Sequence, residues 1–184
     1  MTRVILVVVA GLIAQASCTS SSGKAWHNPS QHAETPTTAA TSTATEVDRT
    51  VDAVRAIHGG AGPWAVAGYR MGEAALKKLG LPRGSFDLEV IHHTPNEVQY
   101  SCIADGAAAA TGASLGKLNL SLEAAPAPET RTVYRRRSTG ALVSYRMTAN
   151  FKARFLDVPR DRLGEAGREA AALDDPEIFE VSPE

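Results

Sequence analysis

The sequence has few of the features that mark common zinc, nucleic-acid-binding and membrane-spanning proteins. Its two cysteines, Cys18 and Cys102, form no Cys-x-x-Cys motif, and no His-Glu-x-x-His pairing occurs, so the usual local zinc motifs are missing. A formal net charge of -1 gives no overall attraction to nucleic acid. The longest apolar run, Val4 to Ala14, is shorter than the about 20 residues that a transmembrane helix needs. Nucleic-acid binding and a permanent membrane span are therefore both disfavoured.

The first residues have the layout of a secretion signal. Arg3 precedes the apolar run, and small residues lead to Cys18. Two cleavage sites compete: Ala14-Gln15-Ala16 fits an ordinary signal peptidase, whereas the four residues that end at Cys18 resemble a bacterial lipobox with Gln at the usual Leu position. We favour a lipid on Cys18, because residues 19–45 are rich in Ser, Thr, Ala and Pro and are typical of a disordered tether behind an anchor. The sequence thus predicts a signal peptide at 1–18 and a protein of the cell envelope, lipid-anchored or periplasmic.

The remainder has room for one modest domain, which we assign to 46–173, with a C-terminal tail at 174–184. A helix is expected to start near Thr45 and to end at His58, because apolar residues recur there at helical spacing. Gly59, Gly60 and Gly62 then permit a sharp loop, and Pro63 suits the first turn of a second helix that ends at Gly80.

Alternating residues predict a strand from Phe86 to His93, a short extended segment at Val98–Tyr100, and another strand at Leu118–Leu122. Between them, the alanine-rich segment 102–110 is expected to be a helix ended by Gly112, with Cys102 and Asp105 one turn apart on one face. Residues 131–137 and 141–147 predict a hairpin, and 160–173 a helix. This order predicts an α+β fold in which helices pack on one mixed or antiparallel sheet.

Two blocks of small residues, one starting at His58 and one at Cys102, resemble the FmdE family of formylmethanofuran dehydrogenase domains. That family opens with a His-Gly-His-x-Cys-Pro-Gly loop that enters a Gly-Tyr-Arg-Met helix. The similarity covers roughly Val47 to Leu122, and the matching positions are His58, Gly59, Pro63, Gly68, Tyr69, Arg70, Met71, Gly72, Cys102, Asp105, Thr111, Gly112, Leu115, Gly116, Lys117, Asn119 and Leu120. The resemblance implies a fold like the GAPDH-like α/β sandwich.

The resemblance also implies a metal site. Imidazole and thiolate are natural ligands of zinc and similar divalent metals, so His58, Cys102 and Asp105 are the candidate ligands, with His92 and His93 as alternates. The sequence departs from the family at Gly60, Gly62 and Trp64, which stand where the family has His, Cys and Gly. Two of the family's ligand positions are therefore occupied by glycine. The remaining glycines of the two blocks, Gly59, Gly68, Gly72, Gly112 and Gly116, are expected to serve loops and close packing.

Three features of the sequence have alternative interpretations. Cys102 could instead pair with Cys18 in a disulfide or be a small buried apolar residue. The letters of Gly112 to Gly116 match the G-x-S-x-G elbow of serine hydrolases around Ser114, but a helix precedes them and a strand follows, the reverse of what that elbow needs. The arginines concentrated on the predicted hairpin are typical of a solvated edge strand, or of a contact with anionic lipid.

These observations favour an exported, lipid-anchored domain that binds a metal ion or a small ligand and has no catalytic activity of its own. The second hypothesis is a degenerate scaffold that acts through protein contacts or as a homodimer, with glycines in place of former ligands. A hydrolase is the third hypothesis, but the sequence shows no assembled base and nucleophile for it. No nucleic acid is expected among the partners.

Overall fold

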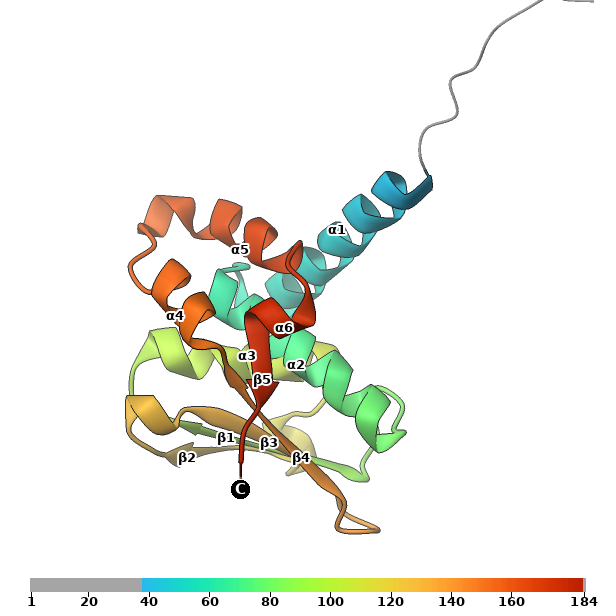
Figure 1. Ribbon diagram of the computed structural model, residues 1–184. Coiled ribbons are helices and arrows are strands. Elements are labelled where there is room, and N and C mark those ends of the chain that lie inside the picture. Colours follow the sequence, from blue (N-terminus) through green and yellow to red (C-terminus); the bar gives the residue numbers. More distant parts are fainter. Residues whose placement is uncertain (1–37, 184) are drawn as a thin grey trace, which may run out of the picture. The chain divides into compact units, whose positions relative to one another are not determined.

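The computed structural model describes the backbone of residues 38–183 and the side chains of residues 45–183 (Figure 1). The predicted signal peptide, the tether as far as residue 37 and Cys18 lie outside these residues. The elements are α1 Thr38–His58, α2 Pro63–Leu79, β1 Leu88–Thr94, α3 Val98–Thr111, η1 Leu115–Lys117, β2 Leu120–Ala124, η2 Ala127–Glu129, β3 Arg131–Arg136, β4 Leu142–Met147, α4 Ala149–Phe155, η3 Arg160–Arg162, α5 Leu163–Ala171, α6 Asp175–Ile178 and β5 Phe179–Val181.

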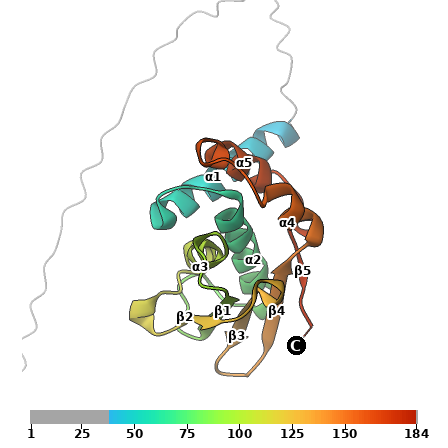
Figure 2. The ribbon, with the colours of Figure 1, turned by 90° about the vertical axis from the view of Figure 1, so that its left-hand side faces the viewer.

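The strands form one mixed sheet in the order β2-β1-β3-β4-β5. Strands β1 and β2 are parallel, and the other neighbours are antiparallel. The helices all lie on one side of this sheet, with α2 and α3 directly on it, α1 packed on both of these helices, and α5 packed on α2 and α1 (Figures 1 and 2). The predicted α+β fold, with helices on one mixed sheet, is confirmed. No helix within residues 38–183 has both the length and the apolar character needed to cross a membrane.

Helices α2 and α3 pack so closely that only glycine fits at their contact. A Cβ atom placed on Gly68 would lie 2.1 Å from the carbonyl oxygen of Ile103. One on Gly106 would lie 1.8 Å from the carbonyl oxygen of Ala65. Glycine lowers intrinsic helix stability, so these positions are explained by the approach of the two backbones. The two small-residue blocks therefore pack on each other.

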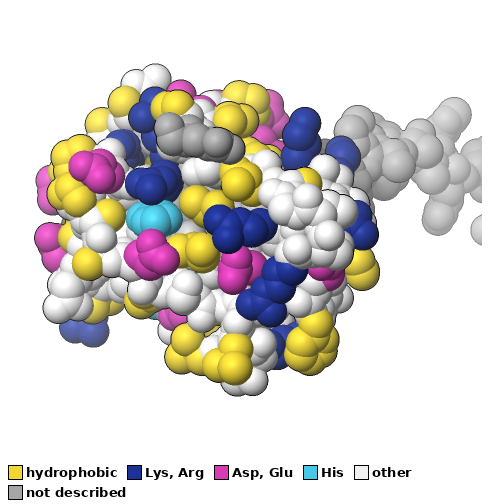
Figure 3. Space-filling model, turned by 90° about the horizontal axis from the view of Figure 1, so that it is seen from below, with side chains coloured by type: hydrophobic (Ala, Val, Ile, Leu, Met, Phe, Trp, Pro, Cys, Tyr) yellow, Lys and Arg dark blue, Asp and Glu magenta, His cyan; other side chains and the backbone are white. Residues whose placement is uncertain are grey.

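The two faces of the sheet differ in character. On the helix side, alternate residues of β1 are buried, from Leu88 to Thr94. The other face carries side chains of both charges, and several form ion pairs, such as Glu89 with Arg135 and Arg146 with Glu180. Figure 3 shows this uncovered face, where Lys and Arg side chains alternate with Asp, Glu and apolar groups.

Several element boundaries differ from the prediction. Helix α1 begins at Thr38 rather than near Thr45, and β1 begins at Leu88, which leaves Phe86 outside the strand and exposed. The extended segment predicted at Val98–Tyr100 is wrong, because these residues form the first turn of α3. Short segments of mixed polarity carry too little periodicity to distinguish a strand from a helix end.

The strand predicted at Leu118–Leu122 begins two residues later, at Leu120, because Leu118 has a left-handed backbone (φ 54°) and ends η1. Residues 174–184, expected to be a tail, include α6 and β5. Strand β5 pairs with β4 as the last strand of the sheet. The hairpin prediction is confirmed by β3 and β4.

Candidate functional site

His58, the last residue of α1, forms the centre of the candidate site. Its Nδ1 atom lies 2.8 Å from Oδ2 of Asp105, a residue of α3. The His58 side chain is 27% exposed and that of Asp105 48%, so both remain accessible to a ligand. An ionised carboxylate can only accept hydrogen bonds, so the proton of a neutral His58 ring lies on Nδ1 and the Nε2 lone pair is left free.

Cys102 lies one turn before Asp105 on α3, as predicted. Its thiol donates a hydrogen bond to the carbonyl oxygen of Gln99 over 3.1 Å. Burial, and then the negative charge of Asp105, raise the pKa of the Cys102 thiol to about 12. The thiol is therefore protonated at neutral pH unless a cation binds beside it. Cys102 forms no disulfide with any residue that the structure describes, and the alternative partner Cys18 lies outside that part of the chain.

Two adjoining pockets share the residues His58, Val98 and Cys102. The first, of about 250 Å³, extends toward β2 and η1; its other lining residues are Ser101, Ala104, Asp105, Leu115, Leu120, Ser121 and Leu122. The second, of about 270 Å³, extends toward α4 and α5; its other lining residues are Trp64, Gln99, Phe155, Leu156, Val158 and Leu163. Together they form an apolar surface groove with one polar centre, an arrangement typical of small-ligand sites.

The second pocket depends on residues that the sequence analysis did not identify. Trp64 is buried, donates its indole N–H to the carbonyl oxygen of Phe155 at 2.9 Å, and packs edge-on against Tyr100. This contact places the segment between α4 and α5 beside the loop that follows His58. Trp64 follows Pro63 and stands at a position where the family has glycine. This departure was the only feature of the sequence that pointed to the second pocket.

The alternate ligands His92 and His93 line neither pocket. His92 is fully buried, with Nδ1 2.9 Å from the Thr132 hydroxyl and Nε2 3.1 Å from the carbonyl oxygen of Tyr100. His93 lies on the uncovered face of the sheet, 3.4 Å from a carboxylate oxygen of Glu123. Burial lowers the pKa of both rings, that of His92 to about 4.

The donors around His58 fit a metal only in part. Among the side chains that the structure describes, no group of three or more His, Cys, Asp or Glu is arranged to hold a metal ion. His58 and Cys102 supply two donors of the type zinc prefers, and Asp105 orients one of them. Structural zinc sites use four protein ligands, so at least two positions would be left to water or to a bound ligand.

The loop after His58 has room where two of the family's ligands are replaced. Gly59 has a positive φ of 82°, which favours glycine. A Cβ on Gly60 would meet nothing within 4 Å, and one on Gly62 would make an ordinary contact with Leu163 at 3.8 Å. Neither position requires glycine for reasons of space. The same is true of Gly116, whereas Gly72 and Gly112 lie in close contacts.

The other motif residues of α2 have structural roles. Arg70 donates hydrogen bonds to the carbonyl oxygens of Ala171 and Leu173 and forms a 2.7 Å ion pair with Asp175, and these contacts tie α2 to the end of α5 and to α6. Tyr69 hydrogen-bonds Glu73, and burial raises the pKa of both side chains, that of Tyr69 to about 12.

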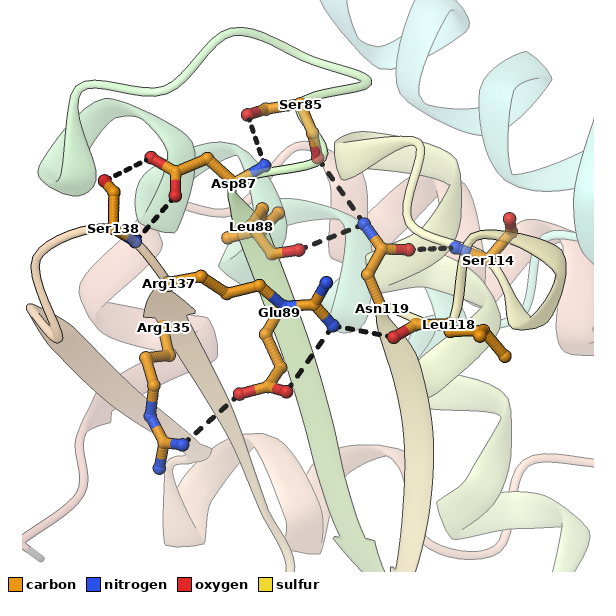
Figure 4. A network of polar contacts seen from close by, with 10 residues as sticks. All are labelled: Ser85, Asp87, Leu88, Glu89, Ser114, Leu118, Asn119, Arg135, Arg137 and Ser138. Atoms are coloured by element: carbon orange, nitrogen blue, oxygen red, sulfur yellow. Dashed lines mark hydrogen bonds and ion pairs between the residues drawn. The ribbon is translucent and has the colours of Figure 1, made fainter.

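Ser114, the candidate serine nucleophile, occupies a turn. Its hydroxyl accepts a hydrogen bond from the backbone N–H of Lys117 and caps η1. Its own N–H donates to the side chain of Asn119, a buried amide that also bonds the carbonyl oxygens of Ser85 and Leu88 (Figure 4). These hydrogen bonds give Ser114 a structural role in the loop.

The family model of FmdE, described as "Molybdenum formylmethanofuran dehydrogenase operon", matches residues 57–176. The chain belongs to the FmdE family. The FmdE match begins one residue before His58 and extends into α6, so it includes the whole candidate site and the contacts of Arg70. No significant match to a curated protein was found. Membership of this family supports an accessory role.

Proposed function

We propose that this FmdE-family protein binds a metal ion, zinc or another divalent metal, or a small ligand in the groove around His58 and Cys102, and that it has no catalytic activity of its own. The observation that carries the proposal is the His58–Asp105 hydrogen bond beside Cys102, at the point where the two pockets meet. The proposal places the protein at the cell envelope, held by a lipid on Cys18.

Each polar residue has a distinct role in this proposal. Asp105 accepts the Nδ1 proton of His58 and holds the ring in place, which leaves Nε2 to bind the ligand. Cys102 binds as a thiolate and releases its proton as the metal enters. Because the pKa of the free thiol is raised to about 12, metal affinity is expected to increase with pH. The apolar walls would contact the remaining part of a small ligand.

The first test is titration of the metal-free protein with Zn²⁺ by calorimetry and with Co²⁺ by absorption spectroscopy. Cobalt bound to a thiolate gives an intense charge-transfer band that reports Cys102 directly. We expect His58→Ala and Cys102→Ser to lower affinity at least tenfold, and Cys102→Ser to abolish the band. His93→Ala is the matched control, because His93 also pairs with a carboxylate but lies on the other face of the sheet. Equal metal affinity in the wild type and all three variants would refute the metal site.

A gain-of-function variant uses the open loop. Gly60→His adds an imidazole at a position where a Cβ atom would meet no other residue within 4 Å. If His58 and Cys102 form half of a metal site, this third donor should raise Zn²⁺ affinity by at least tenfold. Gly116→His, which also adds a histidine in open space but outside the lining of both pockets, is the control.

The second candidate function is a scaffold that works through protein contacts. Two observations favour it: the described residues provide no group of three potential metal ligands, and large apolar residues at the groove, such as Val98, Leu115 and Leu122, are mostly exposed. Under this alternative, the purified protein contains no metal, and His58→Ala leaves its stability unchanged. Light scattering would then test for the homodimer, and Leu122→Ser should weaken a dimer formed through the groove.

A further inference from the structure

Three loops meet at one end of the domain and form a surface that we call the basic end: 80–87, 112–119 and the β3–β4 turn with its flanking residues, 135–141. Hydrogen bonds join them. The backbone N–H of Gly84 donates to the carbonyl oxygen of Thr111 at 2.7 Å. The Lys117 ammonium donates to the carbonyl oxygen of Gly84 in loop 80–87 at 3.4 Å, as well as to that of Gly112 in its own loop at 2.8 Å. Arg137 donates to the carbonyl oxygen of Leu118 at 2.6 Å. The surface is therefore fixed by contacts and is not a set of independent loops.

Large apolar side chains project from this surface. Leu118 is 83% exposed and Phe86 is 68% exposed, whereas the exposed Leu115 lines the first pocket. Leu118 is also the one non-glycine residue within 38–183 that has a positive φ. A left-handed backbone is unfavourable for leucine, and such strain persists only where the surroundings hold it. Figure 4 shows its side chain pointing away from the network that holds its backbone. The fold thus accepts a strained residue and presents its apolar side chain to the exterior.

Basic side chains surround the two apolar ones. Lys117 lies over the Phe86 ring, 5.2 Å from its centroid. The basic end also carries Arg83, Arg135, Arg136 and Arg137, and the nearby carboxylates are Asp87 and Glu89. Five basic groups against two acidic ones leave a local positive surplus on a chain whose net charge is -1. Exposed ion pairs are weak, so these arginines are free to exchange their carboxylate partners for phosphates.

We infer that the basic end docks on an anionic lipid bilayer, with Phe86 and Leu118 inserted among the headgroups and the surrounding Lys and Arg side chains on the phosphates. Exposed apolar groups within a basic ring complement both parts of such a surface, the acyl boundary and the anionic headgroups. Docking of this kind does not depend on the His58 site. It shares with the proposed function only the location at a membrane.

Docking through the basic end would also orient the groove. Leu115, which lines the first pocket, belongs to the same η1 turn that leads to Leu118. A domain docked through Leu118 therefore holds the opening of this pocket close to the lipid surface.

The test is cosedimentation of the chain that starts at position 18, after the predicted signal peptide, with phosphatidylcholine vesicles, with and without phosphatidylglycerol. Cys18→Ser in every sample removes the proposed acyl chain, so that lipid anchoring and docking are separated. We expect binding to the anionic vesicles only, with affinity that decreases as salt increases. Arg83→Gln should lower affinity about fivefold, the equivalent of about 1 kcal/mol per basic residue. Arg162→Gln, which removes an exposed arginine outside the basic end, is the control.

Leu118→Asn provides the apolar arm of the test. Asparagine adopts the left-handed backbone readily, so this variant should fold at least as stably as the wild type while its affinity for anionic vesicles falls about tenfold. Val181→Thr, at an exposed position on β5, is the matched control and should bind like the wild type. The inference is overturned if Leu118→Asn and Arg83→Gln bind as strongly as the two controls, or if the wild type does not distinguish the two kinds of vesicle.

Discussion

Acid should destabilise this fold through a single buried residue, His92. Its imidazole is fully buried on the helix-covered side of β1. The carbonyl oxygen of Tyr100, 3.1 Å from Nε2, can only accept, so Nε2 carries the proton and Nδ1 accepts from the Thr132 hydroxyl at 2.9 Å. The ring is therefore buried in its neutral form, with both nitrogen atoms already hydrogen-bonded.

The size of the effect follows from the pKa. Burial is the main cause that lowers the pKa of His92 from 6.5 to about 4; hydrogen bonds to backbone groups oppose this shift, and the nearby His93 adds a smaller lowering effect. Because the folded pKa lies below the unfolded one, the unfolded chain binds the extra proton between these values. The stabilisation from the neutral ring is fully present above pH 6.5 and is lost as the pH falls toward about 4. The loss amounts to roughly 3 kcal/mol, at 1.36 kcal/mol per pH unit.

The assay is urea denaturation from about pH 8 to about pH 4.5, with the free energy of unfolding compared between the wild type and His92→Gln. Glutamine can still donate to the Tyr100 carbonyl but does not titrate, so its stability should fall less steeply with acid. His93→Gln, which alters a ring that is 16% exposed on the other face of the sheet, should keep most of the wild-type pH dependence. Parallel stability curves for the wild type and His92→Gln would refute the argument. So would an NMR titration in which the folded His92 ring protonates at its ordinary pKa.

Three further outcomes are expected. Gly106→Ala should destabilise the fold by about 3 kcal/mol or more in urea denaturation, because the new methyl group overlaps a backbone carbonyl; Gly60→Ala, in open space, should change stability by less than about 0.5 kcal/mol. Asp105→Asn should lower the affinity of the site for Zn²⁺ about tenfold in calorimetry, since His58 loses its charged partner; unchanged affinity would exclude this role. Arg70→Met should cost about 2 kcal/mol and increase hydrogen exchange in α6, because it leaves two carbonyl groups and a carboxylate without their donor.

Elements with strong local signals were predicted with nearly correct boundaries. Helix α2 begins at Pro63 and ends at Leu79, followed by Gly80, whose φ of 64° is the left-handed C-cap expected of glycine. The β3–β4 hairpin likewise follows from two alternating segments around a turn. Errors appear where the signal is weak or the contact is distant, as at Val98–Tyr100 and in the expected tail. Strand β5 has three residues and exists because it pairs with β4, which no local pattern encodes.

The candidate site was anticipated in part. His58 at a helix end, and Cys102 with Asp105 on one face of the next, could be expected from helical spacing and from the family resemblance. The distance between His58 and Asp105 could not, because it depends on how α1 packs on α3. The wall formed by Phe155 and Leu163 was also missed, because the long-range contact that brings it to Trp64 has no counterpart in the local sequence.

Local sequence signals are enough to establish the α+β class, the bounds of the strongest helix and hairpin, and the resemblance to the FmdE family. These follow from periodicity, from turn residues and from the order of motifs along the chain. The folded structure is needed to tell the accessible histidine from the buried one, to see that glycines join α2 to α3, and to find Leu118 in a strained turn. Such properties depend on packing between residues far apart in the sequence, where burial and backbone approach are set by the whole fold.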